Sequence, residues 1–131
     1  MPLPRPRLYV GLVTADPDRL CAFYGQVLGL PEAEPLAPPG VGRMRRFIHG
    51  DSTLKILEPF DPPAPLAPAP FTAATGIRYL TLTVDDLDAA LSRCAEAGAP
   101  LRIAPVDVRP GVRAAIVEDP DGNAVELMQV D

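Results

Sequence analysis

The segment STLKILEPF, residues 52–60, carries the only lysine of the chain, Lys55, against eleven arginines. The segment has the length and apolar content of a β-strand, with apolar residues on both sides of the lysine. An ammonium group held in such a strand has two chemical uses, because it can pair with a carboxylate or stabilise a developing oxyanion. Alternation along the strand places Lys55 on the same sheet face as Thr53 and Leu57.

An internal repeat gives Lys55 a carboxylate counterpart. A shift of 70 residues brings Tyr9 onto Tyr79, and a shift of 71 brings Lys55 onto Glu126. The repeat relates RLYVGLVTADPDRLCAFYGQVLGLP at 7–31 to IRYLTLTVDDLDAALSRCAEAGAP at 77–100. Two copies of one pattern in a chain of 131 residues predict two similar modules.

Each copy predicts a strand followed by a helix. Residues 8–14 alternate weakly in hydrophobicity, and residues 78–84 alternate clearly. Asp16 suits the N-cap of the first helix with Pro17 behind it, and Asp85 or Asp86 caps the second helix. Gly29 and Gly98 are expected to end these helices, since proline follows each of them within two residues.

Each copy then predicts three strands. The short first strands fall near 31–35 and 100–104; two hairpins follow, 42–48 with 52–58 and 112–118 with 123–130, closed by HGDS and DPDG. We therefore predict a first βαβββ module over 7–58, a proline-rich linker over 59–75, and a second βαβββ module over 76–131. A module with one helix has an exposed sheet face, so the two modules are expected to form one domain over 1–131.

Composition excludes several classes of protein. The net charge of −5 argues against nucleic acid and anionic membrane as partners, because both require a basic surface. The sequence shows neither a signal-peptide pattern nor an 18-residue apolar span, so we expect a cytoplasmic protein. Cys21 and Cys94 are expected to be reduced, buried thiols. The bias toward arginine, alanine and proline suggests a GC-rich bacterial genome.

The doubled βαβββ pattern resembles the vicinal oxygen chelate superfamily, which includes glyoxalases, bleomycin-resistance proteins and extradiol dioxygenases. The resemblance is carried by VGLVTADPDRLCAFYGQVLGL at 10–30, YLTLTVDDLDAALSRCAEAGA at 79–99 and, most specifically, DPDGNAVELMQ at 119–129. It implies an α+β fold in which two tandem βαβββ modules form curled mixed sheets around a cavity. Family members often form homodimers, which we therefore expect here, and some share cavities between chains.

The resemblance also implies four positions around the cavity, which in metal-using members are His, Gln or Glu. Here they match Tyr9, Lys55, Tyr79 and Glu126. Of the four, only Glu126 is of the usual ligand type, because charged lysine has no lone pair and tyrosine binds hard cations poorly unless ionised. We therefore predict neither a metal site nor any other cofactor, and a Lys55–Glu126 pair in place of the metal. The single histidine, His49, is expected to be a solvated turn residue.

Strand alternation predicts a mostly apolar cavity wall with a few hydroxyl groups, typical of a small-molecule site. The simpler interpretation of each residue remains open, since Lys55 can extend to water along apolar surface and tyrosine is common in strands. The candidate catalytic residues are Glu126 and Lys55. The candidate ligand-binding residues are Tyr9, Tyr79, Thr81, Thr83, Arg43, Arg113 and Met128.

Three functions are compatible with this set. The first is a metal-independent protein that binds a small organic molecule, an antibiotic or a metabolite, in the cavity between its sheets. The second is a metal-free isomerase or lyase in which Glu126 is the base and Lys55 or a tyrosine hydroxyl stabilises the oxyanion. The third, ranked last, is a divalent-metal-dependent glyoxalase or dioxygenase. The sequence does not identify the ligand, distinguish enzyme from binding protein, or say whether one chain or two form the cavity.

Overall fold

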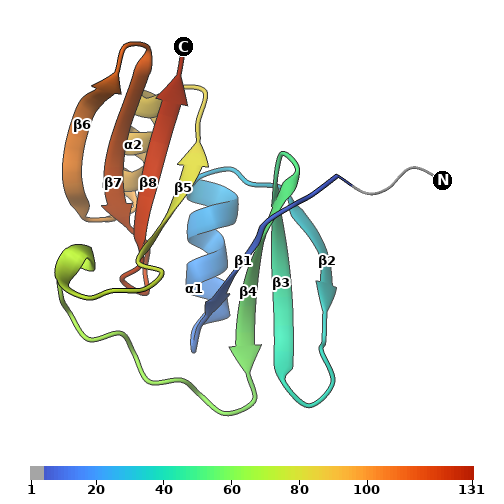
Figure 1. The fold of residues 1–131 in the computed structure, drawn as a ribbon. Coiled ribbons are helices and arrows are strands. Elements are labelled where there is room, and N and C mark those ends of the chain that lie inside the picture. Colours follow the sequence, from blue (N-terminus) through green and yellow to red (C-terminus); the bar gives the residue numbers. More distant parts are fainter. Residues whose placement is uncertain (1–4) are drawn as a thin grey trace. The chain divides into compact units, whose positions relative to one another are not determined.

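The computed structural model describes residues 5–131, and the chain divides into two compact units, residues 1–64 and 65–131. Each unit contains one four-stranded mixed sheet and one principal helix (Figure 1). The element order is βαβββ in both units, as the repeat predicts. No helix within residues 5–131 is both long and apolar enough to cross a membrane.

The first unit contains β1 (Tyr9–Val13), α1 (Pro17–Ala22), β2 (Glu32–Leu36), β3 (Gly42–His49) and β4 (Ser52–Pro59). The strand order is β1-β4-β3-β2, with β1 parallel to β4 and the other pairs antiparallel. The hairpin between β3 and β4 turns at Gly50, whose φ of 58° favours glycine. His49 is the last residue of β3, where the sequence predicts a turn.

The second unit contains β5 (Tyr79–Thr83), α2 (Leu87–Glu96), β6 (Leu101–Arg109), β7 (Val112–Glu118) and β8 (Ala124–Val130). The order β5-β8-β7-β6 repeats that of the first unit. Strand β6 is longer than the predicted strand near 100–104. Between the two sheets the prolines leave residues 60–70 without regular structure, and a 3₁₀ turn follows at Phe71–Ala73.

Both helices begin at the aspartates that the sequence indicates. The Asp16 carboxylate accepts a hydrogen bond from the backbone N–H of Arg19 at 3.2 Å, and Asp86 accepts one from Ala89 at 3.0 Å. Both helical segments end at glycines in the left-handed region, Gly29 with φ 78° and Gly98 with φ 77°.

The first helical segment differs from the second because it is one residue longer. Asp16 and Gly29 are 13 positions apart (29 − 16), whereas Asp86 and Gly98 are 12 apart (98 − 86). The extra residue is absorbed by a π-helical turn at Phe23–Val27, where the Leu28 N–H bonds to the Phe23 carbonyl at 2.9 Å. The helical segment therefore still ends at Gly29, three residues before β2, despite the extra residue.

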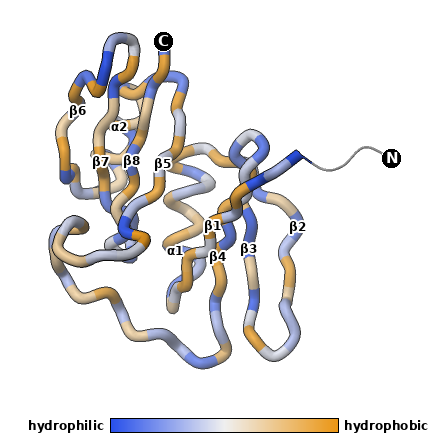
Figure 2. The backbone as a smooth tube through the Cα atoms, in the orientation of Figure 1, coloured by the Kyte–Doolittle hydropathy of each residue, from blue (hydrophilic) through white to orange (hydrophobic). Residues whose placement is uncertain are grey.

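Each helix covers one face of its own sheet. Hydrophobic and hydrophilic residues alternate along the strands (Figure 2). The core of the first unit includes Leu20 and Tyr24 from the helix against Leu54 and Ile56 of β4, all buried. In the second unit α2 packs on β7 and β8, with the buried side chains Leu87, Ala90, Cys94, Val125 and Leu127. Cys21 and Cys94 are buried free thiols, as predicted.

Candidate functional site on the helix-free sheet faces

The face of each sheet opposite its own helix, here called the helix-free face, carries most of the predicted site residues. Because Leu54 and Ile56 are buried under α1, the alternating residues Thr53, Lys55 and Leu57 lie on the helix-free face. Strand register extends that face of the first unit to a set contributed by the neighbouring strands: Tyr9, Gly11 and Val13 of β1, and Met44, Arg46 and Ile48 of β3.

Lys55 lies over the ring of Tyr9. Its ammonium nitrogen is 4.9 Å from the ring centroid, within the range of a cation–π interaction. On β1 the register partner of Lys55 is Gly11, and a Cβ built at Gly11 meets no atom within 4 Å. The space above Gly11 is therefore open, and Lys55 reaches diagonally toward Tyr9 without filling it. Tyr9 itself is 50% exposed, which leaves part of the ring free for a ligand.

Arg46 is a residue of this face that the sequence reasoning missed. It lies directly opposite Lys55 in the antiparallel β3–β4 pair. Its Nε and Nη2 atoms both donate to the backbone carbonyl of Glu34, at 3.0 and 2.8 Å. The signal was present in the hairpin, because pairing His49 with Ser52 across the two-residue turn also pairs Arg46 with Lys55.

On the second unit the helix-free face carries Glu126. The register places Glu126 beside Thr81, whose hydroxyl donates to Glu126 Oε1 at 2.8 Å. Tyr79 lies on the same face, and its ring meets Phe71 edge-on with centroids 5.7 Å apart. Thr83 and Met128 are register partners one step further along the two strands. Tyr79, Thr81, Thr83, Glu126 and Met128 therefore belong to one surface.

The registers of the two units agree with the predicted pseudo-symmetry. In the first unit Gly11, two residues after Tyr9, pairs with Lys55. In the second unit Thr81, two residues after Tyr79, pairs with Glu126. Lys55 and Glu126 thus occupy equivalent strand positions. They belong to different units, and the Lys55–Glu126 ion pair stays a prediction.

Arg43 and Arg113 do not share these faces, which corrects their grouping with the other ligand-binding candidates. Arg43 lies opposite Glu58, which continues the helix-facing series of β4. Arg113 forms an ion pair with Asp88 of α2, with 3.5 Å between Nη2 and Oδ1. The shift of 70 correctly relates the two arginines, but the alternation along β3 and β7 turns both toward the helix side.

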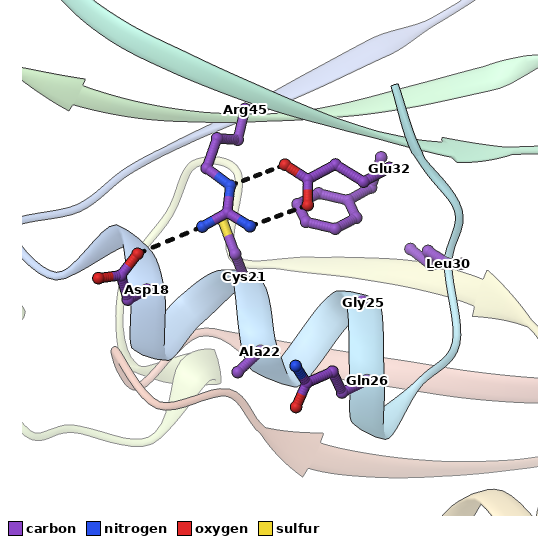
Figure 3. Close-up of a pocket in the computed structure, with 9 residues that line it drawn as sticks. Asp18, Cys21, Ala22, Gly25, Gln26, Leu30, Glu32 and Arg45 are labelled. Carbon is purple, nitrogen blue, oxygen red and sulfur yellow. Dashed lines mark hydrogen bonds and ion pairs between the residues drawn. The ribbon is translucent and has the colours of Figure 1, made fainter. Parts of the chain in front are cut away.

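The first unit also has a hollow of about 430 Å³ between α1 and strands β2 and β3 (Figure 3). Arg45 crosses it and donates through Nε and Nη2 to the two carboxylate oxygens of Glu32, at 2.7 and 2.8 Å. A third contact joins Arg45 Nη1 to Asp18 at 3.4 Å. The guanidinium is therefore already bound by carboxylates.

The thiol of Cys21, which lines this hollow, has low reactivity. Burial raises the pKa of Cys21 to about 11; among the smaller effects, Arg45 lowers it, and Glu32 and Asp18 raise it further. A thiol with this pKa stays protonated near neutral pH and is a poor nucleophile. We interpret the hollow as a structural ion-pair site, and the helix-free faces as the candidate functional site.

Comparison with known proteins identifies the family. The sequence model of the Glyoxalase/Bleomycin resistance protein/Dioxygenase superfamily matches residues 8–127. The chain belongs to this superfamily. The match spans both units and agrees with the resemblance that the sequence motifs indicate. A search of curated proteins finds no match.

Solved structures of this superfamily's fold align over nearly the whole chain. TnmS3, an antibiotic-binding protein from Streptomyces sp. CB03234, is 25% identical with a TM-score of 0.68, over 94% of this chain and 93% of that one. Lactoylglutathione lyase from Agrobacterium tumefaciens is 25% identical with a TM-score of 0.64, over 96% and 94%. A glyoxalase family protein from Bacillus cereus, 21% identical over 93% and 91%, has a TM-score of 0.80 and supports the fold alone.

The four residues that the resemblance assigns to the superfamily's metal-ligand positions form a poor set of donors for a divalent metal ion. Lys55 places a charged nitrogen, without a lone pair, over the Tyr9 ring. On the second unit the one carboxylate, Glu126, accepts a hydrogen bond from Thr81 and shares its face with Tyr79. Within residues 5–131 no group of three or more His, Cys, Asp and Glu side chains is arranged to hold a metal. The donor chemistry, and above all the lysine, disagrees with the superfamily's metal site.

Proposed function

We propose that this chain binds a small organic molecule on the helix-free face of its first unit, and that it does so without a metal ion. The observation that carries the proposal is the Lys55 ammonium held 4.9 Å from the Tyr9 ring centroid. In this arrangement a position used elsewhere in the superfamily for a metal ligand carries a fixed positive charge. The half-exposed Tyr9 ring and the apolar Leu57 and Val13 offer surface to a ligand body.

The comparisons are consistent with this function. TnmS3, which aligns over most of both chains, is an antibiotic-binding protein. A binding role needs a shaped apolar surface and a few polar groups, and it needs no nucleophile or metal. We therefore propose that the ligand is an antibiotic or a metabolite of similar chemistry.

The test combines metal analysis with ligand screening. Protein purified without a metal-affinity tag is digested and analysed by mass spectrometry, and the intact protein is screened by thermal shift against aromatic antibiotics and metabolites. We expect no stoichiometric metal, and at least one compound whose stabilisation is lost in Tyr9→Ala. Near-stoichiometric Zn, Ni, Mn or Fe would instead support a metal-dependent glyoxalase or dioxygenase. A screen without any stabilising compound would count against the binding function.

A second candidate is a metal-free isomerase or lyase, favoured by the hydrogen bond from Thr81 to Glu126 Oε1. That bond orients the carboxylate, and Oε2 accepts no hydrogen bond from the described residues. Glu126 would remove a proton from the carbon next to a carbonyl, whose oxygen takes the negative charge as an enolate. The hydroxyl of Tyr79, on the same face of the second unit, would stabilise that oxyanion. Unchanged turnover in both Glu126→Gln and Tyr79→Phe would eliminate this candidate.

We also propose that the protein is a cytoplasmic homodimer. Dimerisation is common in the superfamily. Size-exclusion chromatography with light scattering measures the mass directly, against a chain mass of 13.9 kDa.

A further inference from the structure

The helix-free face of the first unit has an unbalanced charge. Lys55 and Arg46 lie directly opposite each other on β4 and β3. Like charges in this arrangement repel and destabilise a sheet. No carboxylate occupies a helix-free position of β1, β3 or β4, and neither cation has a carboxylate partner among residues 5–131. The chain as a whole is acidic, with net charge −5, so this positive surface is local.

The two cations point away from each other. Lys55 leans across β4 toward Tyr9 of β1. Arg46 leans the other way, toward the carbonyl of Glu34 on β2. The centre of the face between them therefore carries positive potential without a cationic head occupying it. Both side chains are half-buried, which strengthens their interaction with a charge placed there relative to bulk water.

The surroundings of this centre are apolar on one side. The next register pair along the face is Met44 with Leu57, and both side chains are half-buried. Tyr9 adds an aromatic face. An anionic head near Lys55 and Arg46 with an apolar or aromatic body over Met44, Leu57 and Tyr9 would match every group present.

We propose that the ligand of this protein carries an anionic group, a carboxylate, sulfonate or phosphate, which binds between Arg46 and Lys55. This inference rests on the proposed binding function and specifies the ligand's chemical class. Arg46 offers the anion the guanidinium edge that Glu34 leaves free, and on binding the flexible Lys55 side chain turns its ammonium from the Tyr9 ring toward the anion. If Glu126 neutralises Lys55, as the sequence predicts, Arg46 still lacks a counter-charge and the ligand still supplies it.

The experiment uses two fluorescent probes that share an anilinonaphthalene body. The anionic probe is 1-anilinonaphthalene-8-sulfonate, and the neutral probe is N-phenyl-1-naphthylamine, which lacks the sulfonate. Both are titrated into the full chain and into Arg46→Gln, Lys55→Met and Arg46→Lys. Arg19→Gln is the charge-matched control, because Arg19 lies on α1 and its side chain is 59% exposed. Circular dichroism verifies the fold of each variant.

We expect the anionic probe to bind more tightly than the neutral one. Loss of one charge-assisted contact in Arg46→Gln or Lys55→Met should weaken the anionic probe about tenfold. The neutral probe should be affected less than about twofold. Arg46→Lys should retain most of the affinity for the sulfonate, and Arg19→Gln should retain all of it. Added sodium chloride should weaken the anionic probe only.

Other results overturn the inference in distinguishable ways. If both probes bind equally and the variants change them equally, the protein binds apolar molecules and the anion site does not exist. If neither probe binds the unmodified chain, the proposed binding function fails together with this inference. If Arg46→Gln does not fold, Arg46→Lys and the salt titration decide, and salt-independent binding of the sulfonate refutes the anion site.

Discussion

Arg45 donates to both carboxylate oxygens of Glu32, joining β3 to β2 at 2.7 and 2.8 Å. This two-point geometry is stronger and more directional than a single ion pair. The Glu32 side chain is 36% exposed, so solvent weakens the interaction. We expect Glu32→Gln to lower the free energy of unfolding by about 1 kcal/mol, measured by urea denaturation. The control is Glu34→Gln on the same strand, which removes the same charge without breaking an ion pair and should change stability by less than about 0.5 kcal/mol.

The same pair predicts a pH dependence. Hydrogen bonds from Arg45 hold the pKa of the Glu32 carboxyl below its usual value of 4.5, despite a smaller opposing effect of burial. A carboxyl whose pKa is lower in the folded than in the unfolded state stabilises the fold above the unfolded value. This contribution is lost as the pH falls through the folded pKa. Urea denaturation below about pH 4.5 should therefore show a steeper loss of stability in the natural sequence than in Glu32→Gln. Parallel acid limbs would show that the pair does not contribute.

Variants of Tyr9 and Lys55 distinguish a role of their contact in ligand binding from a role in stability. Removing Lys55 loses a cation–π contact of about 0.5–1 kcal/mol and relieves a like-charge repulsion of about 0.2–1 kcal/mol with Arg46. The two effects oppose each other, so Lys55→Met should leave the free energy of unfolding within about 1 kcal/mol of the natural value. Tyr9→Phe keeps the ring and should retain ligand binding, whereas Tyr9→Ala should abolish it. A large loss of stability in Lys55→Met would assign the lysine a structural role.

The sequence was sufficient for the fold because the repeat, the helix caps and the alternation pointed to the same elements. It also identified the face that carries Lys55, since one buried series, Leu54 and Ile56, fixes the other. Arg43 and Arg113 were named as ligand-binding candidates because the repeat relates equivalent positions, and it does not say which way a strand's side chains point. Arg46 was missed because the pairing of two cations appears only when the hairpin register is followed from its turn.

The π-helical turn was equally hard to predict. The one-residue difference between the copies was visible, but the sequence did not say whether a loop or the helix would absorb it. The structure places it in the helix, where Phe23 and Tyr24 are buried and the Leu28 N–H bonds to the Phe23 carbonyl. A loop insertion would leave those aromatic side chains unchanged, so composition alone could not decide.

Gly25, within this π-helical turn, is packed against the ring of Phe47. A Cβ built on Gly25 lies 2.9 Å from Phe47 Cε1, and the ring is buried at 1% exposure. In an ordinary helix interior, alanine in place of glycine is favourable by about 1 kcal/mol. The added methyl group would press on this buried ring, so we expect Gly25→Ala to lower the free energy of unfolding by about 1–3 kcal/mol.

A second substitution tests the cause. The strand position equivalent to Phe47 in the second unit is Val117, which suggests Phe47→Val as the relieving change. Phe47→Val alone creates a cavity and should destabilise the unit by about 2–4 kcal/mol. If the clash is real, the double variant should be more stable than the sum of the two single effects by at least about 0.5 kcal/mol. Gly11→Ala, whose added Cβ meets nothing within 4 Å, is the control and should be tolerated. Strict additivity in urea denaturation would mean that the glycine is kept for the backbone of the π-helical turn and not for the ring.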